Sequence, residues 1–260
     1  MKNLVLIFSL IAFVAMQLFA QNSNISKQEC QSKTKFSGEE NENQSHMAVA
    51  RCGKPPIIDG VFDEGEWNDA NYIPIGETKK IRLKHDNKHL YLALDGDGGN
   101  IYLNKDDKVY VFHASFSLGW LEYSKFGYAW VRDKDYEWEL TNIQKEGNEV
   151  SQKKMAEYLQ KNGWVMSLIP MGNKCQSEFA ISFERIGIDT KGNSADQAKV
   201  PKMLISSIQN MPPSEYKGED IWLLWPSNGV YSDLINGGKS LGRMKMDTST
   251  WGDIYIELKK

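Results

Sequence analysis

A short stretch from Pro56 to Ala70 constrains the fold more than any other part of the chain. Two strand-forming residues run into an Asp-Gly turn, and a helix of one turn follows. Asp63 and Glu66 have the spacing of a capping box, in which Asp63 caps the helix while Glu66 reaches back toward the turn. Trp67 and Ala70 then face inward. The stretch therefore predicts one corner of a β-sandwich.

From Ala48 onward, short apolar runs alternate with clusters of turn residues. This pattern is typical of a β-sandwich built from short strands. The run from Val109 to Phe116 is apolar on both faces and is expected to be a central, buried strand. One helix interrupts the strands: Ser151 can cap it, and Asn162-Gly163 ends it before Trp164. The predicted fold class is all-β, a two-sheet and mainly antiparallel β-sandwich with one inserted helix. Further strands are expected at 81–83, 90–94, 128–131, 164–169, 179–183, 203–208, 221–225 and 254–258.

The N-terminus has the features of a secretory signal. A single positive residue precedes the apolar run from Leu4 to Phe19, and Ala20 is a small residue at the expected cut. A membrane anchor is the alternative, but polar residues follow the apolar run at once. We expect a signal peptide over 1–20, a disordered leader over 21–47 and one domain over 48–260. The mature chain would carry no membrane span and would be secreted or placed in the periplasm or cell envelope.

Composition and charge limit which kinds of binding partner the chain is expected to have. The chain has 260 residues with 41% hydrophobic content, enough for one full-sized core. Its 31 basic and 34 acidic residues give a net charge of -3, and no basic stripe is present, which argues against a nucleic-acid partner. Eight Trp and 11 Tyr exceed what packing needs and suggest a stacking surface.

Three cysteines in an exported chain allow one disulfide and one leftover thiol. Cys52 opens the first strand and Cys175 precedes the strand at Glu178, so a Cys52–Cys175 bond inside the sandwich is the preferred prediction. Cys30, in the polar leader, offers Cys30–Cys52 as the rival pairing. The chain has no close cysteine pair of the kind that zinc sites use.

Five segments resemble, in the same order, the signature strands of the family 9-like carbohydrate-binding modules, a branch of the DOMON-like sandwiches. The resemblance covers nearly everything after Cys52. It implies a two-sheet sandwich that binds carbohydrate and carries out no reaction of its own. The five segments are the Ile-Asp-Gly corner at 56–70, HLYLAL at 89–94, DKVYVF at 107–112, EFAISF at 178–183 and WGDIYI at 251–256.

Members of this family that bind sugar clamp a terminal sugar between two Trp residues. The matching places here read Tyr102-Leu103-Asn104-Lys105 and Arg243-Met244-Lys245-Met246. Tyr102 can replace the first Trp and nothing replaces the second, so the resemblance does not carry over sugar specificity. By their matching positions, Trp67 and Trp225 are assigned to the core.

Flat aromatic faces and neighbouring polar groups are what sugar binding needs. Trp120, Trp130 and Trp138 cluster in a region rich in glycine and charge, and Trp222 lies close to a Pro-Ser-Asn-Gly turn. The predicted ligand-binding residues are therefore Tyr102, Trp120, Trp130, Trp138 and Trp222.

The loop from Asp95 to Asn100 holds three oxygen-bearing side chains among glycines. A plain Gly-Asp turn is the preferred interpretation. The alternative is a structural Ca²⁺ with Asp95 and Asp97 as ligands, although the spacing fails the EF-hand pattern.

No motif supports catalysis: a nucleophile elbow and a phosphate-binding loop are both missing from the sequence, and no spacing singles out a carboxylate pair. We therefore expect an exported, non-catalytic carbohydrate-binding protein, an accessory to glycan capture or breakdown. One alternative is a haem-binding DOMON-type redox domain, with His113 and either Met166 or Met203 as axial ligands. The other is a structural sandwich without a small ligand, in which all aromatic residues are interior.

Overall fold

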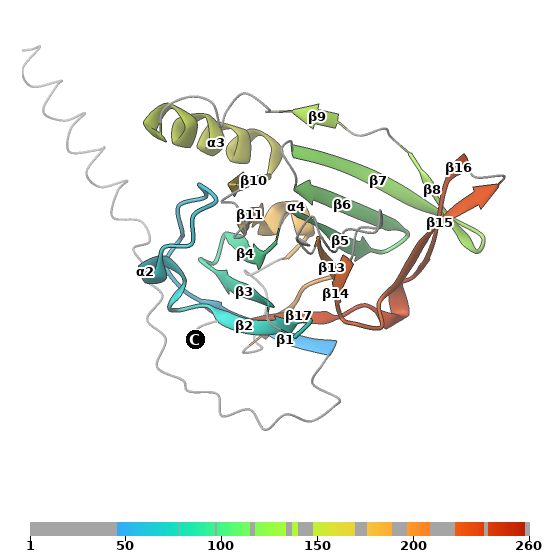
Figure 1. Ribbon diagram of the computed structural model, residues 1–260, viewed down its shortest axis with the longest axis horizontal. Helices are drawn as coiled ribbons and strands as arrows, with labels where there is room; N and C mark the ends of the chain where they lie inside the picture. Colours follow the sequence, from blue (N-terminus) through green and yellow to red (C-terminus); the bar gives the residue numbers. More distant parts are fainter. Residues whose placement is uncertain are drawn as a thin grey trace, which may run out of the picture. The chain divides into compact units, whose positions relative to one another are not determined.

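The computed structural model describes residues 46–77, 79–96, 98–114, 118–133, 137–139, 148–169, 176–188, 197–208, 222–236 and 239–257. The chain divides into two units, Met1–Gln31 and Ser32–Lys260, and every described residue belongs to the second unit. That unit contains two sheets and a few helices (Figure 1). No helix among the described residues is both long and apolar enough to cross a membrane.

The first sheet has eight strands in the order β10-β11-β4-β3-β1-β17-β12, with β2 paired to β3. The pairs β1·β3 and β1·β17 are parallel, and the other pairs are antiparallel. The strands are β1 (Met47–Cys52), β2 (Asn71–Ile75), β3 (Lys79–His85), β4 (His89–Asp95), β10 (Trp164–Ile169), β11 (Gln176–Ser182), β12 (Gln197–Lys199) and β17 (Asp253–Glu257).

The second sheet has nine strands, all antiparallel, in the order β14-β13-β5-β6-β7-β8-β16-β15, with β9 paired to β7. The predicted two-sheet, mainly antiparallel architecture is thus confirmed. The strands are β5 (Gly99–Lys105), β6 (Lys108–Ala114), β7 (Leu118–Phe126), β8 (Ala129–Arg132), β9 (Glu137–Glu139), β13 (Lys202–Ile208), β14 (Trp222–Trp225), β15 (Val230–Asn236) and β16 (Lys239–Asp247).

The inserted helix is α3 (Asn148–Asn162), which begins three residues before the predicted cap at Ser151. It ends as expected, because Gly163 has a left-handed φ of 73° and its N–H donates to the Leu159 carbonyl. Met155 and Tyr158 are buried, and the Tyr158 ring lies edge-on to Trp164 at 6.1 Å. The apolar stripe therefore fixes α3 against β10. The other helices within the described ranges are α2 (Glu64–Trp67), α4 (Phe183–Ile186) and the 3-10 turn η3 (Thr248–Thr250).

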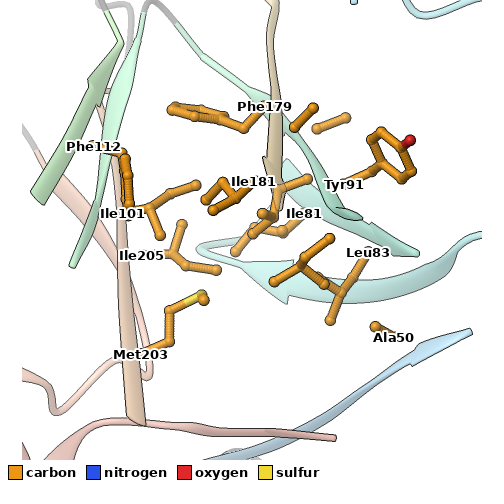
Figure 2. Packing of buried hydrophobic residues seen from close by; sticks show 14 of the residues in the cluster. Ala50, Ile81, Leu83, Tyr91, Ile101, Phe112, Phe179, Ile181, Met203 and Ile205 are labelled. Atoms are coloured by element: carbon orange, nitrogen blue, oxygen red, sulfur yellow. The ribbon is translucent and has the colours of Figure 1, made fainter. Parts of the chain in front are cut away.

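The main core lies between the two sheets. Figure 2 shows Ile101, Phe112, Met203 and Ile205 of the second sheet with Ile81, Leu83 and Ile181 of the first. Phe112 also packs on Trp164, with the ring centroids 5.2 Å apart. Alternate residues of β5, β6 and β13 supply these side chains, since successive residues of a strand point to opposite faces.

A second core covers the other face of the second sheet. Its members come from the alternate positions of the same strands and from the end of the chain, so the central strands of this sheet are buried on both sides. This confirms the prediction for the start of the run at Val109. The second core consists of Tyr102, Val109, Val111, Leu121, Tyr123, Trp130, Leu204, Met244, Met246 and Trp251.

The corner at 56–70 has the predicted capped helix, but Ile57 and Ile58 before it do not lie in a strand. Strand β1 ends at Cys52, where the sequence placed the start of the first strand. Asp63 caps α2 by accepting from the Gly65 N–H at 3.1 Å, and Trp67 and Ala70 are buried. The Glu66 carboxylate reaches back beyond the cap and accepts from the Ile57 N–H at 3.3 Å. The Asp-Gly turn is thus tied to the helix that follows it.

Two buried charges hold this corner on the first sheet. The Glu178 carboxylate accepts from the Trp67 indole N–H at 2.8 Å, from the Gly60 N–H at 2.8 Å and from the Asp59 N–H at 3.1 Å. The Lys84 ammonium lies 5.0 Å from the Trp67 ring centroid, and it donates to Asp69 Oδ1 at 2.9 Å and to a backbone carbonyl of α2. Burial raises the pKa of Glu178 to about 7. Two of the sequence segments quoted above, the Ile-Asp-Gly corner and the Glu178 strand, therefore meet at one polar anchor.

Candidate functional site

Two of the predicted ligand-binding aromatics are core residues. Tyr102 is 6% exposed and packs edge-on to Trp251 at 6.0 Å, while its hydroxyl accepts from Asn100 Nδ2 at 3.3 Å. Trp130 is 3% exposed, and its indole N–H donates to the Met246 carbonyl at 3.1 Å. The prediction that these rings form a stacking surface is therefore wrong, because both fill the second core.

Trp138 and Trp222 belong to strands β9 and β14, where they lie opposite Gly119 and Ile208. Their side chains lie outside the part of the chain that the structure describes, so their role in binding stays a prediction. Trp67 and Trp225, which the sequence assigned to the core, are 2% and 4% exposed.

Among the predicted ligand residues whose side chains the structure describes, Trp120 is the one that is partly exposed. It lies on β7 opposite Phe112 and packs at the margin of the main core. The Arg185 guanidinium carbon lies 4.4 Å from the Trp120 ring centroid and 5.7 Å from the centroid of Tyr110. Arg185 is held there by α4, whose cap Ser182 accepts from the Arg185 N–H at 3.1 Å.

Charged groups adjoin these rings. Glu122 lies two residues after Trp120 on β7 and opposite Tyr110, so all three side chains lie on one face. The Lys108 ammonium donates to Glu122 Oε2 at 2.9 Å and lies 3.9 Å from Asp133 Oδ2. Its hydrogen bond with Glu122 raises the pKa of Lys108, so the ammonium stays charged at neutral pH. We call Lys108, Tyr110, Trp120, Glu122, Asp133 and Arg185 the edge cluster.

The edge cluster combines aromatic faces with hydrogen-bond donors and acceptors whose charges balance. Two cations, Lys108 and Arg185, stand against two carboxylates, Glu122 and Asp133. A neutral ligand with many hydroxyl groups matches this chemistry better than a strongly charged one. The sequence singled out Trp120 and its charged neighbourhood. Arg185 comes from a distant segment, and no local signal connects it to Trp120.

Asp95 has structural partners. Its Oδ1 accepts from the Arg82 guanidinium at 2.9 Å, and its Oδ2 accepts from the Lys80 N–H at 3.1 Å. Asp97 lies outside the described residues. Within the described ranges, no group of three or more His, Cys, Asp and Glu side chains is placed to hold a metal ion.

The haem pairs considered from the sequence do not fit the strand geometry. His113 lies opposite Asn100 on the face of the second sheet that carries the second core, and its Nδ1 is 2.6 Å from Asn100 Oδ1. Met203 and Met166 belong to the main core, on the other side of that sheet. An axial pair of His113 with either methionine is therefore wrong.

Cys52 is disulfide-bonded, and both other cysteines lie outside the described residues. Both predicted pairings of Cys52, with Cys175 and with Cys30, therefore stay predictions.

No protein-family model matches the chain, and no curated protein matches it in sequence. Two solved structures of a family 9 carbohydrate-binding module from Caldicellulosiruptor kristjanssonii, in complex with cellotriose and with glucose, are similar to it. They share 11% and 12% identity with TM-scores of 0.40 and 0.41, over 82% of this chain and 95% and 97% of theirs. A candidate carbohydrate-binding protein from Bacteroides uniformis is similar at 10% identity and a TM-score of 0.42, over 81% of this chain and 97% of that one.

Proposed function

We propose that this chain is an exported, non-catalytic carbohydrate-binding protein that captures neutral glycans through the edge cluster. The observation that carries the proposal is the Trp120 ring, which is partly exposed, held by Arg185 and flanked by the ion pair of Lys108 and Glu122. Sugars present C–H groups that stack on aromatic rings and hydroxyl groups that need donors and acceptors nearby. The edge cluster supplies both. Export rests on the sequence features of residues 1–20.

The test is isothermal titration calorimetry of the purified chain against linear cello-, xylo- and manno-oligosaccharides. Binding to at least one series is the expected result, and Trp120→Ala should weaken it about tenfold or more because the stacking face is lost. The variant Trp120→Phe keeps an aromatic face and should retain most of the affinity. Thermal melts of both variants show whether each one is folded.

Two outcomes would remove the proposal. One is a flat response of the wild-type chain to all three series and to a broad glycan array. The other is binding that Trp120→Ala leaves unchanged, since the glycan would then contact another part of the molecule.

A further inference from the structure

The edge cluster is one end of a longer face on strand β7. Trp120, Glu122, Ser124 and Phe126 are alternate residues of this strand, so their side chains point to the same side. The contacts agree with this assignment, because Lys108 reaches Glu122 and Asp133, and Asp133 in turn accepts from the Ser124 hydroxyl. Phe126 is six positions after Trp120, which corresponds to about 20 Å along an extended strand. We call these four side chains the β7 face.

The far end of the β7 face is aromatic and open to solvent. Phe126 is 75% exposed, and Tyr128, across the hairpin turn, is 88% exposed. Gly127 makes this turn with a φ of 61°, and a side chain added there would have no neighbour within 4 Å. A Phe ring this exposed forgoes most of the stabilisation that burial would contribute. Two adjacent rings in this state form an apolar tip that a partner can cover.

Polar and charged groups lie between the two aromatic ends. Ser124 and Glu122 provide a hydroxyl and a carboxylate, and Lys108 and Asp133 reach the same place from β6 and from the residue after β8. A lipid or an apolar protein surface laid along this strand would desolvate these groups without new hydrogen bonds, which is costly. A ligand with hydroxyl groups would meet them with donors and acceptors. With Arg185 beside Trp120, two cations balance the two carboxylates, which favours an uncharged ligand.

We propose that the β7 face binds several consecutive units of a linear, uncharged polysaccharide, with Trp120 and Phe126 stacking on separate sugar rings of one chain. This inference rests on the proposed function and extends it. The edge cluster alone accounts for the binding of a short sugar, whereas the distance between Trp120 and Phe126 selects a chain of several units. Affinity should therefore rise with chain length.

The test is calorimetry with the purified chain and a ladder of one sugar series, for example cellobiose to cellohexaose or the matching xylo- or manno-oligosaccharides. In the series that binds, affinity should increase along the ladder. Phe126→Ala should lower the affinity for the longest member about fivefold to tenfold and leave the shortest member unchanged. The matched control is Tyr72→Ala, which removes another exposed aromatic from β2 in the first sheet and should change neither value.

The outcomes separate the two proposals. If no member of any series binds, the proposed function fails together with this inference. Sugars could bind without a rise in affinity along the ladder, or Phe126→Ala could leave the affinity for the longest oligosaccharide unchanged. Either result would overturn the proposal for the β7 face and leave the proposed function intact. Two further results would overturn the proposal for the β7 face, if sugar affinity stays unchanged in Phe126→Ala. One is that the variant no longer binds vesicles of phosphatidylcholine with phosphatidylglycerol. The other is that it no longer forms a dimer that the wild-type chain shows in sedimentation.

Discussion

Burial decides how Glu178 ionises. The carboxylate accepts three N–H groups, which favours the charged form, but removal from water outweighs them and raises its pKa to about 7 from 4.5. A raised pKa in the folded chain means that the protonated form fits the fold better than the ionised form. The polar anchor of the 56–70 corner is therefore sensitive to pH near neutrality.

For this reason the free energy of unfolding should fall as the pH rises. The contribution of Glu178 is fully present below pH 4.5 and is lost as the pH passes through about 7. The change is on the order of 3 kcal/mol. Glu178→Gln cannot ionise, so urea denaturation of this variant at a series of pH values should show a flatter profile. The control Glu157→Gln, on the exposed side of α3, should keep the wild-type slope. Equal slopes for wild type and Glu178→Gln would contradict the assignment.

The burial of a tryptophan could be predicted from the sequence at some positions and not at others. Trp67 was predicted to be a core residue from its position after the capped turn, and it is buried. Trp120 and Trp130 looked alike in the sequence, since both stand in strands among polar and glycine residues. Trp130 lies within the second core and is buried, whereas Trp120 packs at the margin of the main core and is only partly buried. Which face is covered depends on segments far away in the chain.

At the scale of single elements, α4 has only four residues and depends on its cap. Ser182→Ala should cost about 1 kcal/mol of stability. It should also weaken glycan binding severalfold, because α4 positions Arg185 beside Trp120. Asp63→Ala removes the equivalent cap of α2 and is the matched control, with a similar loss of stability and unchanged affinity. Chemical denaturation and calorimetry on both variants test this, and equal affinities for the two would show that α4 has no part in binding.

Most elements could be predicted because their signals are local. The strands at 90–94, 164–169 and 179–183 and the end of α3 at Gly163 all follow from apolar periodicity and glycine. The start of α3 was placed three residues late, since Ser151 is a good cap residue but the chain is already helical there. The parallel pairing of β1 with β3 and β17 has no local signal. It joins segments that are distant in sequence.

At the scale of the whole unit, the second sheet is shared by two cores. Leu103 points into the main core and Leu121 into the second core, and both are fully or almost fully buried. Leu103→Ala and Leu121→Ala should each cost about 2 to 5 kcal/mol. Because one sheet carries both cores, each variant should unfold in a single transition, with coincident curves from circular dichroism and tryptophan fluorescence. Separate transitions would show that the cores are independent.

The fold class could be predicted from the sequence because three local signals agree on paired sheets. These signals are the alternation of apolar runs with turn clusters, the turn residues themselves and the one capped corner. The candidate site followed only in part. Trp120 could be named, but its companions Arg185, Tyr110 and Lys108 reach it through strand pairing and through α4. A site assembled from three elements has no single motif.

Glycan binding at Trp120 is tested most directly by oxidation of tryptophan side chains. The extent of oxidation is measured for each residue by mass spectrometry, with and without the tightest-binding oligosaccharide. Among the tryptophans whose side chains the structure describes, Trp120 should be oxidised in the free chain and protected in the complex. The others, Trp67, Trp130, Trp164, Trp225 and Trp251, are buried and should react slowly in both states. If Trp120 is oxidised equally fast with and without bound sugar, glycan binding at Trp120 is contradicted.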